Sequence, residues 1–333
     1  MSVDVTIMLD YYIDKKEIEE IIYSLGFQRT EYENTFFWYD KSFISTRGCW
    51  FSYTFDEDVQ INGTTKNCKT ICCTNTKSGR SYDDFQKQLD TIKEIEKRYG
   101  GVVYSDDELG YFENDLPRLS RTEIACGFVY VTYQTNLIMV KELIEDVDLD
   151  KIKGLRELGV PPFFQKNFLR NNVLLPFFVS ILENFLKSFL YGYIQTNEEA
   201  QNKIYKKKAN ISYSVVKEII DGQKNIIDIE IAEYSFQNFN SANRAYKEYA
   251  NIDLFKDILI GELSLKGEER KLISVLQEMI DSRHKLIHEA NLNYELDKKM
   301  MELYYQALEL LGSNIVRFLK EKRNVSIDLE EVL

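Results

Sequence analysis

Short runs in which apolar and polar residues alternate dominate the first part of the chain. Alternation with a period of two is typical of half-buried β-strands. Turn-forming pairs, Asn62-Gly63 and Ser78-Gly79, punctuate these runs. The predicted strands are Val3–Leu9, Thr35–Tyr39, Cys49–Phe55, Lys69–Thr74, Val102–Tyr104 and Ile124–Gln134.

Segments with helical spacing of their apolar residues lie among these strands. Lys15–Leu25 is one, and Gly26 ends it. Another begins at a cap residue, Ser81, and runs to about Tyr99, and a short third helix spans Asn136–Glu145. This order of elements predicts an α+β domain over residues 1–150, with a two-layer, ferredoxin-like arrangement of helices on one antiparallel sheet.

From about Pro161 the hydrophobic period becomes helical, and residues 151–333 are predicted to form an all-α bundle. We place the boundary within Val147–Gln165, where an acidic run meets Pro161-Pro162. The last two helices are joined by few residues and should pack as an antiparallel hairpin. The predicted helices are Asn167–Tyr193, Ser214–Asp221, Ser241–Leu259, Gly267–Ala290 and Tyr294–Arg323.

Composition narrows the classes of partner. The chain has 42 basic and 54 acidic residues and a formal net charge of -12, whereas a sequence-blind nucleic-acid coat protein is normally basic. Any contact with RNA should therefore be a local basic pocket that is sensitive to salt. The apolar run Val173–Leu182 is interrupted by Pro176 and is too short for a bilayer. Five cysteines and no secretory leader favour reduced thiols in the cytoplasm.

Both histidines of the chain, His284 and His288, lie next to Arg283 in the segment Asp281-Ser282-Arg283-His284-Lys285-Leu286-Ile287-His288-Glu289. Imidazole is the side chain whose unperturbed pKa, about 6.5, is closest to neutral pH. A proton carrier beside a permanent cation suits chemistry on a phosphate. If the chain performs histidine acid–base chemistry, it performs it here.

The stretch Arg283–His288 resembles the signature of the HEPN family, in which Arg is followed after four to six residues by His. The segment Ile181–Lys187, with Glu183, is similar to the acidic and aromatic pattern of that family's first long helix. The resemblance covers roughly Gln165–Lys322. It implies a helical bundle that pairs as a homodimer, with a site shared between two chains.

The activity that the resemblance implies is metal-independent cleavage of RNA, with no cofactor, by attack of the ribose 2′-hydroxyl on the adjacent phosphorus. His288 would move a proton and Arg283 would stabilise the phosphorane, while His284 would be a second proton carrier or a phosphate contact. Glu183 would orient Arg283 or a histidine. Lys285 would hold the RNA backbone, unless it pairs with Asp281. The basic run with Lys206 and Lys207 is either a solvated loop or a further RNA contact.

Many HEPN nucleases are toxins or act in defence against phage, so an antitoxin or a phage-derived trigger is a further expected partner, with the first domain as sensor or regulator. Alternatives are a non-catalytic module that binds RNA or a protein, and a ligand-sensing regulator. In a further alternative, Arg283, His284, Lys285 and His288 have no functional role. They would stand near the end of a helix only because positive charges interact favourably with the negative end of the helix dipole. Two histidines at i, i+4 also fit a zinc site, but Lys285 takes the place of the usual Glu, and this interpretation ranks lower.

Overall fold

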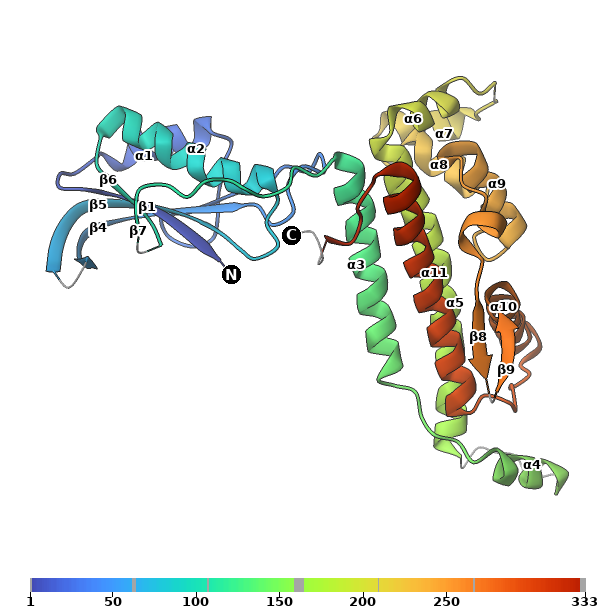
Figure 1. The fold of residues 1–333 in the computed structure, drawn as a ribbon. Coiled ribbons are helices and arrows are strands. Elements are labelled where there is room, and N and C mark those ends of the chain that lie inside the picture. The colour runs from blue at the N-terminus through green and yellow to red at the C-terminus, as the bar shows by residue number, and fades with distance from the viewer. Residues whose placement is uncertain are drawn as a thin grey trace. The chain divides into compact units, whose positions relative to one another are not determined.

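The computed structural model describes residues 2–61, 64–106, 108–158, 165–208, 210–265 and 267–329. They divide into two compact units (Figure 1). The first ends at Ile124 and includes Leu329, and the second runs from Ala125 to Asp328. An α+β unit is thus followed by a mostly helical one, as the hydrophobic patterns predict. The division between the units falls at residues 124 and 125, earlier than the boundary near residue 150 that the sequence analysis predicted. Pro161-Pro162 lie outside the described residues.

The first unit is built on one antiparallel sheet. Among the described residues its strand order is β2-β3-β4-β5-β1-β6-β7. The predicted turn at Asn62-Gly63, between β4 and β5, lies outside the described residues. The elements are β1 (Val3–Leu9), α1 (Lys15–Ser24), β2 (Gln28–Arg29), β3 (Thr35–Trp38), β4 (Cys49–Ile61), β5 (Thr64–Thr76), α2 (Tyr82–Tyr99), β6 (Val102–Ser105) and β7 (Glu108–Leu109).

Strand alternation places the core of this unit between the sheet and its helices. Val5 and Ile7 of β1 pack in one cluster with Ile22 of α1 and Leu89 of α2, so both helices cover the same face (Figure 1). Met8 points to the other face and joins a smaller cluster with Ile71. This arrangement is the two-layer order that the sequence predicts.

A buried carboxylate joins the beginning of α2 to the loop before β4. Asp84 is fully buried and forms a capping box with Ser81. Its carboxylate also accepts hydrogen bonds from the backbone N–H groups of Thr46, Arg47 and Gly48, at 3.0, 2.8 and 3.0 Å. No ion pair with this carboxylate forms among the described residues, and peptide N–H groups and hydroxyls satisfy its charge instead. The helix start predicted at Ser81 is confirmed.

The second unit is helical apart from a small hairpin, β8–β9. Three long helices, α3, α5 and α11, run side by side through it (Figure 1). Its elements are α3 (Arg121–Lys141), α4 (Leu149–Glu157), α5 (Lys166–Thr196), α6 (Glu198–Tyr205), α7 (Tyr213–Ile220), α8 (Ile226–Ala232), α9 (Phe239–Ala250), a π-helical turn η2 (Leu254–Ile258), β8 (Glu262–Leu265), β9 (Glu268–Lys271), α10 (Leu272–Glu289) and α11 (Lys298–Arg323).

The strand predicted at Ile124–Gln134 and the helix predicted at Asn136–Glu145 are both wrong, because Arg121–Lys141 is one helix, α3. Its β-branched and aromatic residues resemble a strand locally, but some of them, such as Tyr130 and Tyr133, are buried in the helical core. Tyr133 shows why: its ring stacks on Phe185 of α5 with centroids 3.9 Å apart. Its hydroxyl donates a 2.7 Å hydrogen bond to the carbonyl of Leu308 in α11. Tertiary packing thus overrides local strand propensity.

Three predicted helices are shorter than expected. The predicted Tyr294–Arg323 begins only at Lys298, after its cap residue Asp297. Ser241–Leu259 divides into α9 and η2, because Asn251 adopts a left-handed conformation with φ of 52° and ends α9. The predicted Gly267–Ala290 begins only at Leu272, since the residues before it form β9.

Helix α5 is the one helix among the described residues that is long and apolar enough to cross a membrane. Half of its most apolar stretch is buried inside the unit, around residues such as Phe178 and Leu182. The helix continues through Pro176 and extends on both sides beyond the apolar run Val173–Leu182 that the sequence analysis considered. This burial is consistent with the core helix of a soluble protein.

Candidate functional site

The two histidines lie on α10, whose position follows from its apolar stripe. Leu272, Leu276 and Met279 are buried at helical spacing and hold the helix against the bundle. The segment after α10 is fixed to the beginning of α5, because Asn172 accepts a hydrogen bond from Asn293 N–H at 2.7 Å and donates one to its carbonyl at 3.2 Å. The end of α10 is therefore a defined surface.

His284 and His288 lie together on the exposed side of the last turns of α10. Their ring centroids are 4.4 Å apart with an interplanar angle of 41°. Both side chains are exposed, and α10 ends one residue later, at Glu289. The expectation that these residues share a line on the helix is confirmed. Two imidazoles in contact can exchange protons with one substrate group and with solvent.

Arg283 occupies a different side of the helix from the histidines. It continues the buried stripe one turn beyond Met279 and is itself half-buried. Its Nε atom is buried and has no hydrogen-bond partner. Among the described residues no carboxylate forms an ion pair with its guanidinium. A permanent cation whose donors are unused is suited to bind an anion from outside the chain.

Lys285 lies between the histidines in the sequence, at the rim of a pocket beside α10. The sequence analysis left open that it pairs with Asp281, but in the part of the chain that the structure describes no such ion pair forms. Asp281 instead accepts a 2.8 Å hydrogen bond from Nε2 of Gln277. Lys285 is exposed, and so remains available to an external group.

Glu183 of α5 has a partner other than the expected ones. Its carboxylate accepts a hydrogen bond from Nε2 of Gln237, in the segment before α9. No hydrogen bond or ion pair joins it to Arg283 or to either histidine among the described residues. Because Gln237 lines the pocket beside α10, Glu183 supports the wall of that pocket and not the motif itself.

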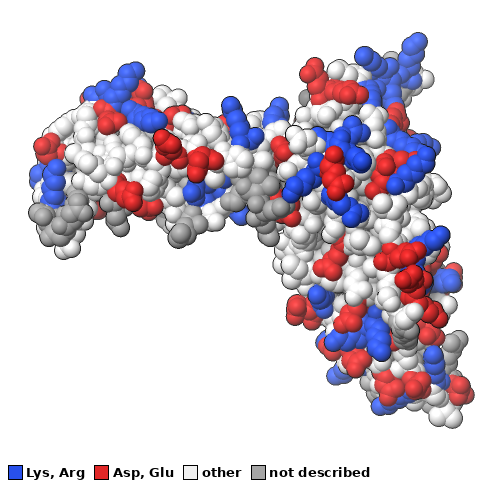
Figure 2. Space-filling view, in the orientation of Figure 1, with Lys and Arg blue, Asp and Glu red and all other residues white. Residues whose placement is uncertain are grey.

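The structure separates the lysine run from the histidines. Lys206 and Lys207 follow α6, at the end of α5, whereas the histidines lie level with its beginning (Figure 1). Between Asn172 and the end of α5 the helix rises by about 35 Å. Basic side chains gather over the α6–α7 end of the unit (Figure 2). Within one chain, these lysines and the histidines do not meet at one phosphate.

Lys207 is moreover already paired. Its Nζ lies 2.7 Å from a carboxylate oxygen of Glu230 and 2.9 Å from one of Glu248. Burial alone would lower the pKa of Lys207, but the hydrogen bonds to these two carboxylates outweigh it and raise the pKa above its ordinary value. The side chain stabilises the packing of α8 and α9 and is not a free cation.

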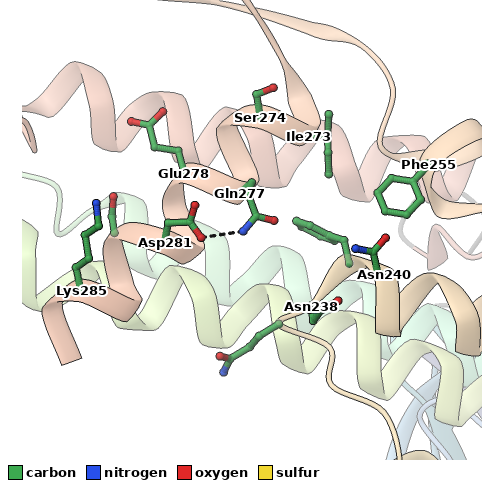
Figure 3. A pocket seen from close by; sticks show the side chains of 12 residues that line it. Asn238, Asn240, Phe255, Ile273, Ser274, Gln277, Glu278, Asp281 and Lys285 are labelled. Carbon is green, nitrogen blue, oxygen red and sulfur yellow. Dashed lines mark hydrogen bonds between the residues drawn. The ribbon is translucent and has the colours of Figure 1, made fainter. Parts of the chain in front are cut away.

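A pocket that the sequence analysis missed lies beside the motif. Its volume is about 670 Å³, within the range of about 300–1,000 Å³ for ligand sites. In Figure 3, Gln277 of α10 points toward Asn240 and Phe255 across the pocket, with Lys285 at the other end. One signal was present in the sequence, because residues 235–240 combine two phenylalanines with four polar residues. The lining residues are Gln237, Asn238, Phe239, Asn240, Phe255, Ile273, Ser274, Gln277, Glu278, Asp281, Ser282 and Lys285.

The histidine and cysteine side chains, which are common metal ligands, form no metal-binding cluster among the described residues. No group of three or more His, Cys, Asp or Glu side chains among the described residues is placed to hold a metal ion. Cys72 is buried in the core of the first unit while its neighbour Cys73 lies on the opposite face, as strand geometry requires. Burial raises the pKa of the Cys72 thiol to about 12, so it stays protonated at neutral pH. Cys49, too, is buried in this core.

Comparisons of the chain with protein-family models, with curated protein sequences and with solved structures found no match. The site itself offers a pair of exposed imidazoles, a half-buried guanidinium without a partner among the described residues, an exposed ammonium and an adjoining polar pocket. These groups can bind a phosphate and move protons at it.

Proposed function

We propose that the C-terminal unit is a HEPN-type endoribonuclease, which cleaves RNA without a metal by internal attack of a ribose 2′-hydroxyl. The observation that carries the proposal is the combination on α10 of the His284–His288 ring contact with the unpaired Nε of Arg283. The chain has an excess of acidic residues, so carboxylate partners are plentiful. A cation left without one, on the same helix as two imidazoles, supports a role in binding an external anion.

The division of labour follows from the chemistry of each group. His288 removes the proton of the 2′-hydroxyl or donates a proton to the leaving 5′-oxygen, and His284 is the second proton carrier or a contact to the phosphate. Arg283 stabilises the additional negative charge of the phosphorane. Lys285 binds the RNA backbone. Glu183, Lys206 and Lys207 receive no role at the reacting phosphate, because their partners are Gln237, Glu230 and Glu248 or they lie at the other end of α5.

The site is proposed to be shared by a homodimer. Arg283 and His288 are five positions apart, so they are separated by about 140° around the helix. One chain thus presents the two groups in different directions. A two-fold axis beside α10 would bring the guanidinium of one chain to the imidazoles of its partner.

The setting proposed is the cytoplasm, with the nuclease acting as a toxin or in defence against phage, and either held in check by an antitoxin or activated by a phage-derived trigger. The first unit would be the sensor. Its strand order β4-β5-β1-β6, with α1 and α2 on one face, is the order of a ferredoxin-like domain, extended here by β2, β3 and β7. The second candidate is a non-catalytic module that binds RNA, which the separation of Arg283 from His288 within one chain favours.

Incubation of the purified protein with total RNA in EDTA tests the proposal. The wild type is expected to cut RNA but not DNA and to leave 2′,3′-cyclic phosphate ends. His288→Ala and Arg283→Ala are each expected to lower the rate by about 100-fold or more, because each removes a group that acts in the transition state. Arg118→Ala, an exposed arginine of the first unit, is the matched control. Equal cutting by His288→Ala and wild type would exclude catalysis at α10.

A further inference from the structure

We infer that the pocket beside α10 binds an unpaired nucleobase with an exocyclic amino group, adenine or cytosine in preference to uracil. The inference deepens the proposed function and rests on it for the identity of the ligand as RNA. It names which part of the substrate the pocket takes and which residues select it.

The floor and one side of the pocket are apolar. Phe239 is buried beneath it, and Ile273 of α10 adjoins it. Phe255, in the π-helical turn, is 38% exposed and presents its ring to the pocket (Figure 3). A flat aromatic base can stack on such a ring, as unpaired bases do on aromatic side chains in RNA-binding sites.

The other side of the pocket carries unused polar groups. Asn240 and Ser274 make no side-chain hydrogen bond with any other described residue, and the amide oxygen of Gln277 is likewise unengaged. Asn and Gln amides pair with the Watson–Crick or Hoogsteen edge of adenine, and carboxylates accept from the amino group of cytosine. Asp281 supplies such an acceptor, because only its Oδ1 is engaged by Gln277, whereas both oxygens of Glu278 already accept from Arg270 and Tyr304. Uracil has no exocyclic amino group and offers a carbonyl in its place, which the Asp281 carboxylate repels.

The charge of the pocket also distinguishes base from phosphate. The carboxylates of Asp281 and Glu278 line it, and although Arg270 offsets the charge of Glu278, no ion pair offsets that of Asp281 among the described residues. A phosphate would be repelled there, whereas the end of the pocket toward the histidines carries Lys285. An RNA strand can therefore place a base in the acidic part and its backbone at the basic end.

The distance along the helix fits one short stretch of a single strand. Gln277 and His284 are seven residues apart on α10, which is a rise of about 10 Å. Lys285 belongs both to the rim of the pocket and to the histidine segment. A base held at Gln277 therefore positions a nearby phosphodiester at the imidazoles, which would make cleavage depend on the base.

Binding of fluorescent single-stranded octamers of A, C and U to the full-length His288→Ala protein in EDTA tests the inference. The A and C octamers are expected to bind at least about tenfold more tightly than the U octamer. Gln277→Ala in the same background should remove most of this preference, and Phe255→Leu should weaken all three. Gln86→Ala is the matched control, because Gln86 makes the same 2.8 Å bond to a carboxylate four residues on, Asp90, in the first unit.

Each outcome has a distinct meaning. Equal binding of the three octamers, or a preference that survives Gln277→Ala, overturns the base pocket even if the wild type cleaves RNA. Selective binding without cleavage by the wild type supports the pocket and overturns the nuclease. Absence of both binding and cleavage overturns the two proposals together.

Discussion

At the scale of single residues, neighbours on α10 have opposite environments. Arg283 is half-buried and continues the apolar stripe, while His284 one position later is exposed. Each residue turns about 100° around a helix, so this contrast is a direct result of geometry. The chemistry available to each side chain was readable from the sequence. The partner of each side chain could not be predicted from the sequence. Glu183 binds Gln237 and Lys207 binds Glu230 because the fold brings distant segments together.

Asp84 gives a prediction at this scale. Asp84→Asn is expected to lower the free energy of unfolding of the first unit by about 2–3 kcal/mol, because an amide cannot accept from all the buried N–H groups that the carboxylate satisfies. Trp38 and Trp50, the two tryptophans of the chain, both lie in this unit, so their fluorescence in a urea titration measures the loss. Asp90→Asn, at an exposed position of the same helix, is the control. Equal midpoints for the two variants would contradict this account.

At the scale of elements, the distance between α3, α5 and α11 depends on the size of the side chains where these helices meet. Tyr133 is held by its stack on Phe185 and by its bond to Leu308. Gly312 of α11 lies directly against it. A sequence pattern shows that α11 is amphipathic, but it does not show which residue of α3 it meets. That information comes only from the packed bundle.

Two glycines of this bundle should respond in opposite ways to alanine. A Cβ at Gly312 would lie 2.9 Å from Cε1 of Tyr133, which is too close, and Tyr133 cannot move without losing its bonds. Gly312→Ala should therefore destabilise the unit, since overpacking costs about 1–3 kcal/mol and exceeds the gain in helix propensity of about 1 kcal/mol.

At Gly192 of α5 the nearest atom to an added Cβ would be 3.6 Å away, the carbonyl oxygen of Ala125, which is ordinary contact. Gly192→Ala should be neutral or stabilising by up to about 1 kcal/mol. Thermal unfolding followed by circular dichroism at the helical band compares the two variants. A lower midpoint for Gly192→Ala than for Gly312→Ala would show that these contacts do not limit the packing.

At the scale of the whole molecule, the proposed homodimer gives a prediction that a monomeric site does not. If each site takes Arg283 from one chain and His288 from its partner, a heterodimer of Arg283→Ala and His288→Ala chains has one site with both groups intact. Equal mixing gives about half heterodimers, so about a quarter of wild-type activity should return after subunit exchange. Each variant alone is the control. Failure to recover activity, with exchange shown by size or labelling, would place both groups of a site in one chain.

The sequence by itself determined the local features of this protein. The hydrophobic period predicts the strand Val3–Leu9 and the change from an α+β unit to a helical one. Residue type predicts the cap at Ser81, and helix geometry predicts that His284 and His288 lie close together. These depend on interactions within a few residues, and a sequence displays such interactions directly.

Tertiary structure decided the rest. Arg121–Lys141 is a helix because Tyr133 is enclosed by α5 and α11, although its residue types favour a strand. The pocket beside α10 exists because η2 and the start of α9 are folded against that helix. Lys207 is not available to an external anion because it forms ion pairs with Glu230 of α8 and Glu248 of α9. Each of these facts depends on segments far apart in the chain, and the free energy of burying them together outweighs local preference.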